Sequence, residues 1–255
     1  MHRVAVFRPN DERLARACDL LCDLDAVPVA DPMLAVEPTG ATPREDADYV
    51  VLTSKTGAEL VAEAGWRPAD DATVCAIGER TADALRRAGY RVDLVPEEFS
   101  SSGLVAALRD RAAGARVEVA RSDHGSPVLT DGLNDAGAYV HETVLYRLVR
   151  PPGSGDSAEL AAAGDLDAAL FTSSLTVAHF LDAAAERGVR EAAVAGLNEA
   201  VVGAIGEPTR DRAAAAGVEV DVVPETATFA ALARAAVERL DGDGNADADA
   251  DAGGA

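Results

Sequence analysis

The sequence is poor in lysine, aromatic residues and cysteine, and the shortage of lysine already removes one class of function. Lys55 is the only lysine among 23 basic residues, and these face 44 acidic residues, so the net charge is −21. A protein this acidic has no basic stripe with which to displace counterions from phosphates, which argues against nucleic acid as a partner. Its self-repulsion is relaxed by screening at high ionic strength, so the composition is typical of a salt-adapted protein.

Long apolar runs, secretory signals and cysteine frameworks are also missing. No stretch of 18 apolar residues occurs, so we expect a cytoplasmic protein with no membrane partner. The three cysteines, Cys18, Cys22 and Cys75, fit the role of small apolar residues better than a disulfide or metal site.

The motifs of common enzyme classes are absent as well. Neither the dinucleotide-binding nor the P-loop glycine motif is present, and the histidines lack metal-ligand spacing. Asp123 and His124 together with Ser173 would suggest a hydrolase triad, but Ser173 does not lie in a Gly-x-Ser-x-Gly elbow. We therefore expect no metal and no cofactor.

The most informative feature that is present is an internal repeat. Residues 76–97, which begin Ala-Ile-Gly-Glu-Arg-Thr, return 128 positions later as residues 204–225, with 13 identities in 22 positions. Each copy predicts a buried strand ending at glycine, a loop with a hydroxyl, a helix stopped at Ala-Gly and a second strand stopped by proline. In such a βαβ unit the glycine turn lies at the carboxyl end of the first strand. Ligands bind at that edge because helix amides without an intrahelical partner point outward there.

Weaker echoes extend the repeat over most of the chain. The strand, helix and strand of residues 3–29 resemble those of residues 116–146 at a constant offset of 113, and residues 51–55 resemble residues 170–174. The units therefore alternate between short and long. Two sequential domains or a nested arrangement fit this order, and nesting is favoured because prolines and glycines mark two crossings, near residue 35 and at 150–155.

The prediction is an α/β fold of two similar parallel-sheet domains joined by two crossings. Residues 1–35 with 151–240 form a discontinuous first domain, and residues 36–150 form the second. Residues 241–255 are rich in aspartate and alanine without apolar periodicity, so we expect a disordered acidic tail.

The order of these motifs resembles that of the uroporphyrinogen-III synthase family. The resemblance covers residues 1 to about 240 and rests on the motifs just described together with the Thr-Ser loops at 53–54 and 172–173, the loop 121–125 and the Tyr146 strand before a linker. It implies two nested α/β domains with a cofactor-free active site in the cleft between them. It also implies a lyase of porphyrin and heme biosynthesis that cyclises hydroxymethylbilane, inverting the last pyrrole ring through a spiro intermediate and releasing water. Pro208 and Arg210 replace the family's usual small or hydroxyl neighbours of Thr209, so the second turn is expected to bind differently.

The implied substrate decides which residues are candidates for the site. A linear tetrapyrrole with eight carboxylates is not attracted by the overall field of an acidic protein, so recognition should fall to strand-end amides, hydroxyls and a few arginines. The predicted substrate-binding residues are Arg8, Ser54, Lys55, Gly78, Thr81, Arg121, Ser122, Ser173, Ser174, Gly206 and Thr209, and Tyr146 is the predicted catalytic residue.

Each candidate also has a structural interpretation. The serines and threonines can cap helices, Arg8 and Arg121 can form ion pairs, and Tyr146 can be a core aromatic residue. Because the reaction relies more on geometry than on strong acids or bases, positioning should dominate. We expect a monomer that receives its substrate by transient hand-over from the upstream bilane-forming enzyme. The alternative is a noncatalytic two-domain module that binds anions or tetrapyrroles, or senses them.

Overall fold

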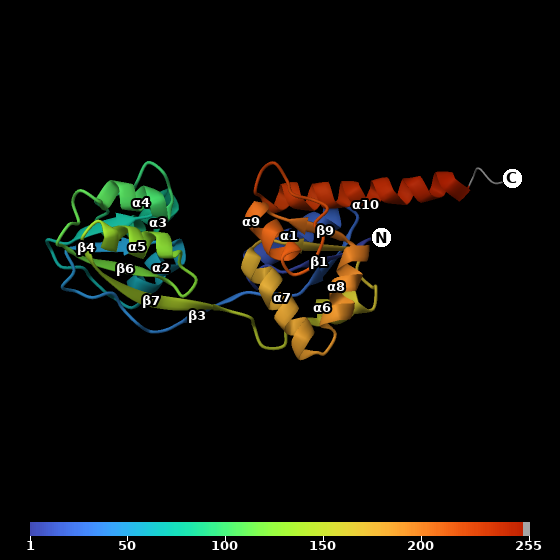
Figure 1. Ribbon diagram of the computed structural model, residues 1–255, viewed down its shortest axis with the longest axis horizontal. Coiled ribbons are helices and arrows are strands. Elements are labelled where there is room, and N and C mark those ends of the chain that lie inside the picture. The colour runs from blue at the N-terminus through green and yellow to red at the C-terminus, as the bar shows by residue number, and fades with distance from the viewer. Residues whose placement is uncertain (252–255) are drawn as a thin grey trace. The chain divides into compact units, whose positions relative to one another are not determined.

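Two α/β units make up the part of the chain that the computed structural model describes, residues 1–251. Unit 1 consists of Met1–Ala35 and the chain from Val149 onward, and unit 2 consists of Val36–Leu148. Each unit has its own sheet with helices on both faces (Figure 1). The predicted mixed α/β class with parallel strands is confirmed.

Unit 1 is built on a four-stranded sheet in the order β2-β1-β8-β9, and its strands are parallel. The strands are β1 (Arg3–Val6), β2 (Val27–Ala30), β8 (Ala168–Phe171) and β9 (Val201–Ala204). The helices are α1 (Glu12–Asp23), α6 (Asp156–Ala162), α7 (Ser174–Glu186), α8 (Arg190–Glu199), α9 (Glu207–Ala214) and α10 (Phe229–Asp251).

Alternate residues of the unit 1 strands enter two separate cores. Ala5, Phe7 and Phe171 pack with α6 to α9, whereas Val4 and Val6 pack with α1 and α10 on the other face. Successive side chains of a strand point to opposite faces, so a strand covered on both sides must be apolar throughout. Strands β8 and β9 are apolar throughout, and every residue of both strands is buried.

Unit 2 is built on a five-stranded sheet in the order β3-β7-β6-β4-β5. The strands are β3 (Ala35–Pro38), β4 (Tyr49–Leu52), β5 (Thr73–Ala76), β6 (Arg116–Ser122) and β7 (Tyr139–Val149). The helices are α2 (Lys55–Glu63), α3 (Glu79–Arg87), α4 (Ser101–Leu108) and α5 (Pro127–Asp135). Helices α2 and α3 cover one face, with Leu52 and Ala120 beneath them, and α4 and α5 cover the other, with Val51 and Val119 beneath them.

The repeated cassette departs from its prediction in one detail. The expected second strand of each βαβ unit is reduced to a single β-bridge, Cys75 to Leu94 in unit 2 and Gly203 to Val222 in unit 1. Proline follows each bridge by two residues and has no N–H with which to continue a ladder. The chain therefore leaves the sheet after one rung.

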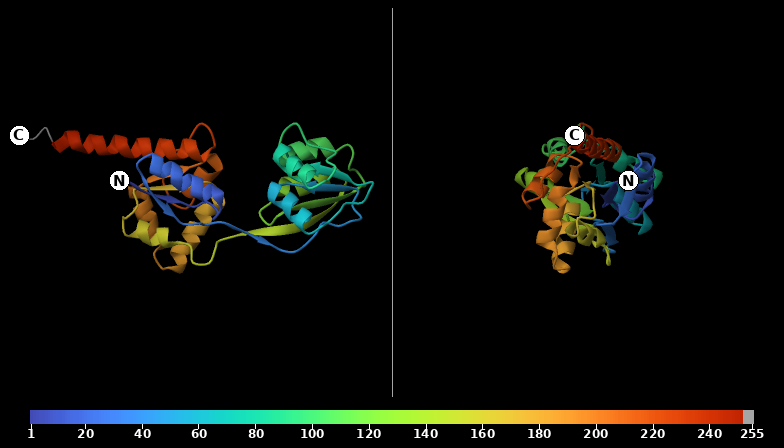
Figure 2. Two further views of the ribbon diagram at one scale, coloured as in Figure 1. Left: turned by 180° about the vertical axis from the view of Figure 1, so that it is seen from behind. Right: turned by 90° about the vertical axis from the view of Figure 1, so that its right-hand side faces the viewer.

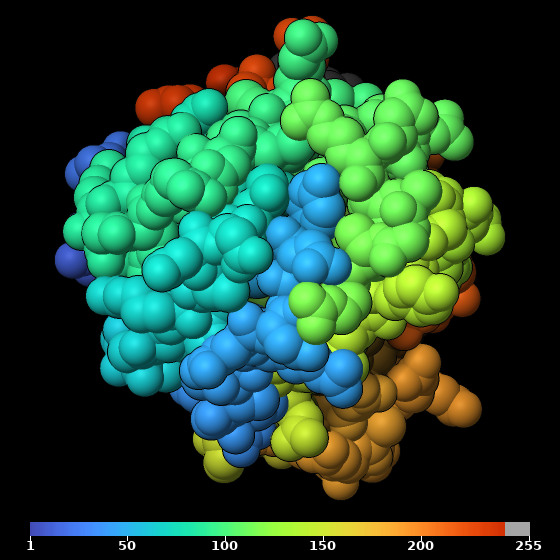
Figure 3. All heavy atoms as spheres, turned by 90° about the vertical axis from the view of Figure 1, so that its left-hand side faces the viewer, coloured from blue at the N-terminus to red at the C-terminus, as the bar shows by residue number. Residues whose placement is uncertain are grey.

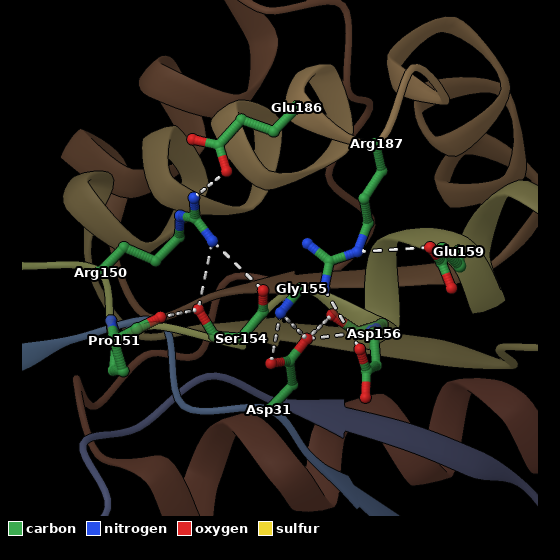
Figure 4. A network of polar contacts seen from close by, with 10 residues as sticks. Asp31, Arg150, Pro151, Ser154, Gly155, Asp156, Glu159, Glu186 and Arg187 are labelled. Atoms are coloured by element: carbon green, nitrogen blue, oxygen red, sulfur yellow. Dashed lines mark hydrogen bonds and ion pairs between the residues drawn. The ribbon is translucent and has the colours of Figure 1, made fainter.

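Asp31 joins the two segments by which the chain leaves and re-enters unit 1 (Figure 4). Its carboxylate is 5% exposed and accepts hydrogen bonds from the amides of Gly155 at 2.8 Å and Ser157 at 2.9 Å, and from the Ser157 hydroxyl. Gly155 has φ +112°, and a Cβ there would lie 2.4 Å from Arg187 Nη1, so only glycine fits. The segment that leaves unit 1 after β2 is thus hydrogen-bonded to the segment that returns before α6.

The segment 241–255, which the sequence predicts to be a disordered acidic tail, begins within a helix, and its disorder stays a prediction. Helix α10 continues to Asp251, and residues 252–255 lie outside the described part of the chain. Alanine is the strongest helix former, so the alternating alanines after Gly242 favour continuation of a helix that tertiary packing has already started.

Candidate active site

The predicted site residues lie at the carboxyl ends of parallel strands in both units. In unit 1, Arg8 follows β1, Ser173 and Ser174 follow β8, and Gly206 and Thr209 follow β9. In unit 2, the corresponding edge carries Ser54, Lys55, Gly78, Thr81, Arg121, Ser122 and Tyr146. Each sheet therefore collects its candidates along the edge at which open α/β sheets bind ligands.

Tyr146 and Ser54 are brought into direct contact. The Tyr146 hydroxyl donates to Ser54 Oγ at 3.0 Å, although β6 lies between their strands in the sheet. Ala120 occupies the intervening strand, and its small side chain leaves room for the ring in the core beneath α2 and α3. Tyr146 is buried, with 6% of its surface exposed, so its hydroxyl is held in a defined position.

Ser54 and Ser173 are helix caps in equivalent places. Ser54 Oγ accepts from Gly57 N at 2.9 Å at the start of α2, and Ser173 Oγ accepts from Thr176 N at 3.2 Å at the start of α7. Both residues have the extended backbone of an N-cap. Capping thus accounts for both serines structurally, and their binding of substrate stays a prediction.

The two repeated turns place glycine, not threonine, at the helix cap. Gly78 and Gly206 are the N-caps of α3 and α9, and neither supplies a side-chain hydrogen bond. Thr81 and Thr209 lie one turn into the helices and are each 4% exposed, so neither acts as the cap. The first amides of α3 and α9 consequently keep the unpaired donors that suit an anion.

Arg121 is held by its own unit. It is 6% exposed, its guanidinium pairs with Glu142 and donates to the Ser126 carbonyl, and its Nε has no hydrogen-bond partner among the described residues. The loop packs closely over it, because a Cβ on Gly125 would lie 2.5 Å from Arg121 Nε. This partly buried ion pair fixes the loop after β6, and a substrate contact by Arg121 stays a prediction.

The remaining candidates are more exposed. Lys55 Nζ pairs with Glu59 at 2.8 Å along α2, and Ser174 Oγ donates to the Pro208 carbonyl at 2.8 Å, which links the starts of α7 and α9. Ser122 ends β6 beside Tyr146 at an irregularity in the β6–β7 register. The Arg8 guanidinium lies 5.2 Å from the centre of the Phe229 ring.

Comparison with known proteins identifies the family of this chain. The family model described as uroporphyrinogen-III synthase HemD matches residues 14–234. A protein of Methanothermobacter thermautotrophicus described as "Putative uroporphyrinogen-III synthase" is 32% identical over 257 residues, which cover 93% of this chain and 100% of that protein. This chain belongs to the uroporphyrinogen-III synthase family.

One further relative supports the family assignment over about half of the chain, and two solved structures support the fold. The uroporphyrinogen-III synthase of Synechococcus elongatus is 32% identical over 142 residues, about half of each chain. A crystal structure of a mutant uroporphyrinogen-III synthase from Thermus thermophilus has a TM-score of 0.65 at 22% identity, covering 94% of this chain and 98% of that one. The enzyme from Helicobacter pylori has a TM-score of 0.61 at 12% identity and covers 93% and 99%. At such identities the two structures establish a shared fold.

In this family member the structure also reveals neighbours of the site that the sequence interpretation missed. Phe99 is 61% exposed and packs on the first turn of the cassette, where a Cβ on Gly78 would lie 3.2 Å from Phe99 Cγ. Arg13 and Arg16 join Arg8 in one pocket of unit 1. The spacing of Arg13 and Arg16 by three residues on a helix could have signalled a shared face, whereas no sequence pattern predicts that Phe99 reaches Gly78.

The hydrolase triad considered from the sequence is not assembled within one unit, and a further pocket of unit 2 lies apart from the predicted substrate-binding residues. His124 Nδ1 lies 2.8 Å from Asp123 Oδ1, but Ser173 belongs to the other unit. A pocket of about 330 Å³ lies at the amino ends of β6 and β7, the edge of unit 2 seen in Figure 3 and opposite to Ser54. Within the described residues, no cluster of His, Cys, Asp and Glu could hold a metal, and no helix is long and apolar enough to cross a membrane.

Proposed function

We propose that this chain is a uroporphyrinogen-III synthase that cyclises hydroxymethylbilane with inversion of the last pyrrole ring, a lyase step of porphyrin and heme biosynthesis. The observation that carries the proposal is family membership over residues 14–234, with a relative of 32% identity that is covered over its whole length and matches 93% of this chain. The alternative of a noncatalytic binding module is not favoured, because the relatives that match bear the synthase name.

Recognition in this proposal relies on local donors. The substrate carries eight carboxylates, and the net charge of −21 opposes them at long range. The uncapped first turns of α3 and α9 and the hydroxyls of Ser54 and Ser173 offer donors at the carboxyl edge of each sheet, and the Ser174 hydroxyl would have to leave the Pro208 carbonyl to join them. Amides at helix N-termini bind anions without a counter-charge, so such an edge suits a polycarboxylate.

The chemistry demands positioning more than acid or base strength. Loss of the substrate's hydroxyl leaves an electrophilic azafulvene, which the far pyrrole ring attacks at its substituted carbon to form a spiro intermediate. That intermediate reopens and closes to the inverted macrocycle, and the ring proton that is lost balances the proton taken up by the departing hydroxide as water. The enzyme's task is to hold both ends of one flexible molecule so that inverted closure outpaces direct closure.

Tyr146 is the proposed proton donor for departure of the hydroxyl. A phenol is neutral before the step, so no ionised group is buried in the resting enzyme. It gives its proton to the departing hydroxide, which leaves as water, and takes up the proton that the attacking pyrrole ring loses. In the structure its hydroxyl donates to Ser54 Oγ at 3.0 Å, so the proposal requires it to turn from Ser54 to the substrate. Ser54 Oγ keeps its second contact with Gly57 N in either state.

The proposed cellular conditions follow from the acidic composition of the protein and from the reactivity of the bilane. The acidic composition suits a protein that works at high ionic strength in the cytoplasm, since screening relaxes both self-repulsion and repulsion of the substrate. The bilane also closes without an enzyme, which favours its transient hand-over from the upstream enzyme. The monomeric state remains a proposal.

The decisive experiment measures the isomers formed. The protein is incubated in high salt with freshly generated hydroxymethylbilane, the products are oxidised, and isomers III and I are separated. We expect isomer III to predominate in the presence of the protein and isomer I in its absence. An unchanged isomer ratio on addition of the protein would refute the proposed activity.

A further inference from the structure

A pocket of about 280 Å³ in unit 1 is lined by three arginines and by apolar side chains. Its lining residues are Arg8, Arg13, Arg16, Ala17, Leu20, Phe229 and Ala230. Arg8 follows β1, the α1 residues share one face of that helix, and Phe229 and Ala230 begin α10. Helices α1 and α10 lie side by side over the same face of the sheet (Figure 2).

The composition of this pocket is unusual for so acidic a chain. Acidic residues outnumber basic ones by 44 to 23, yet no acidic residue lines it. Two other pockets in the described residues mix charges: one combines Arg44 and Arg116 with Asp46 and Glu118, and the other has three acidic residues and Arg111. The arginine pocket therefore presents one sign of charge.

The nearby carboxylates leave one positive charge unmatched. Asp11 binds Arg13 at 2.5 Å and also caps α1, and Glu12 lies 3.8 Å from Arg16 at the exposed surface. For Arg8 no ion pair is found in the described part of the chain. Burial lowers the pKa of Arg8, and the charges of Arg13 and Arg16 lower it further, whereas Asp11 raises it.

The apolar wall determines which anion fits. The Phe229 ring is 7% exposed and faces the Arg8 guanidinium at 5.2 Å, and Ala17 and Leu20 continue the apolar surface along α1. A bare inorganic anion would leave this wall unused. A carboxylate joined to a flat apolar ring would place its charge between the arginines and its ring against the wall.

We propose that this pocket is a subsite for one pyrrole ring of the substrate, with Arg8 and Arg16 binding a carboxylate arm and Phe229, Ala17 and Leu20 contacting the ring. Arg13 is a positioning residue, because its guanidinium is already engaged by Asp11. The proposal rests on the proposed function and assigns one of the eight carboxylates to a place. It also explains how a strongly acidic protein holds an anionic substrate: it binds the carboxylate in a pocket whose lining contains no acidic residue and in which Arg8 has no ion-pair partner among the described residues.

The test separates binding from turnover and from folding. Arg16→Gln and the double variant Arg8→Gln with Arg16→Gln are compared with Arg212→Gln, a matched loss of one charge on α9 of the same unit. Arg16 suits the first variant because its side chain is 70% exposed, so its loss should not unfold the protein. Arg8→Lys is a second variant that keeps the charge but loses the planar fork.

The readouts are KM and kcat for hydroxymethylbilane, and calorimetric binding of a monopyrrole that bears one acetate and one propionate arm. We expect the double variant to raise KM about tenfold or more with kcat within about twofold, since a hydrogen bond between charged groups is typically worth a factor of this size. Binding of the monopyrrole should be lost in the double variant and kept in Arg212→Gln.

An unchanged KM in the double variant would overturn the proposal, as would equal binding of the monopyrrole to wild type and double variant. Inorganic phosphate that binds the pocket as tightly as the monopyrrole would also overturn it, because the apolar wall would then contribute nothing. If the wild type forms no isomer III, the proposed function fails, and the monopyrrole measurement still decides the subsite.

Discussion

The two units share one plan and differ in what that plan presents to a ligand. By the sequence repeats, β2-β1-β8-β9 of unit 1 corresponds to β7-β6-β4-β5 of unit 2, and only β3 is added at the edge of the second sheet. Even a side-chain bond is repeated: Asp93 accepts from Val74 N at 2.9 Å, and Asp221 accepts from Val202 N at 2.7 Å, 128 positions later. The repeat therefore preserves the residues that build strand, turn and helix.

The differences fall at the carboxyl edges. Residue Arg80, at the second position of α3, corresponds to Pro208 in α9, so the second turn has one amide fewer to offer. Exposed Phe99 corresponds to Ala227, and at the offset of 113 Tyr146 corresponds to buried Met33. The comparison shows that a duplicated scaffold can keep its fold while the carboxyl edges of its two sheets diverge, and the predictions below test how unequal these edges are in function.

The largest expected effect follows from removing the Tyr146 hydroxyl, which unit 1 lacks. Tyr146→Phe should lower turnover by about a hundredfold, the usual size of general acid assistance. Single changes Ser54→Ala, Thr81→Ala, Ser173→Ala and Thr209→Ala should each cost less, because positioning is shared among many donors. Steady-state turnover with hydroxymethylbilane measures the ranking.

The control for Tyr146→Phe is the melting temperature, which should stay close to wild type because the ring remains in the core. Ser54→Ala removes the partner of the Tyr146 hydroxyl and a helix cap worth about 1 kcal/mol, so it separates stability from chemistry. Full activity in Tyr146→Phe would show that the Tyr146 hydroxyl has no chemical role in turnover.

A smaller effect should follow from making the first turn of α3 resemble that of α9. Arg80→Pro deletes the amide at the second helical position, where proline is tolerated, and should raise KM several-fold if that amide binds a carboxylate. Arg80→Ala removes the same side chain but keeps the amide, so it is the matched control. Equal KM values for Arg80→Pro and Arg80→Ala would show that the amide has no part in binding.

These cases also show what the sequence could predict. The parallel α/β class and the placement of candidates at strand ends followed from the repeats, because buried apolar strands alternating with helices are typical of parallel sheets, whereas the strand order was not predicted. The Thr81 and Thr209 hydroxyls were candidate caps by residue type, but the structure places them one turn inside their helices, buried, with glycine as the cap. Spacing alone does not fix which residue of a Gly-x-x-Thr turn is the N-cap.

Contacts between segments distant in sequence were beyond prediction. The Tyr146–Ser54 bond spans 92 residues, and the arginine pocket combines the end of β1 with the start of α10. Both depend on how helices pack over a sheet, and on small residues such as Ala120 in the intervening strand. No pattern within a single segment carries that information.

The repeated carboxylates allow the stabilities of the units to be compared. Asp93→Ala and Asp221→Ala each leave a buried strand amide without its acceptor, so each should lower the free energy of unfolding by about 1–3 kcal/mol. Trp66 is the only tryptophan and packs against Tyr90 in unit 2, so its fluorescence reports that unit in a denaturant titration. Circular dichroism reports both units.

If the units unfold independently, Asp93→Ala should shift the Trp66 transition and Asp221→Ala should leave it in place. Asp93→Asn and Asp221→Asn keep an acceptor oxygen and serve as milder controls. A Trp66 transition that moves equally in both alanine variants would mean that the two units unfold as one.

The smallest effect is expected at the end of unit 1, where α10 continues far beyond the length of its counterpart α4 in unit 2. The buried part of α10 ends near Val237, and Asp241 still pairs with His2 at 3.5 Å, so truncation after Gly242 keeps these contacts. The removed residues are mainly alanine and aspartate with no apolar face, and activity and melting temperature should stay at the wild-type values. Truncation before Leu240 is the positive control, since it removes a residue that packs against the core of α1 and α10. A large loss on truncation after Gly242 would mean that this acidic segment contributes to unit 1 in a way that α4 does not need in unit 2.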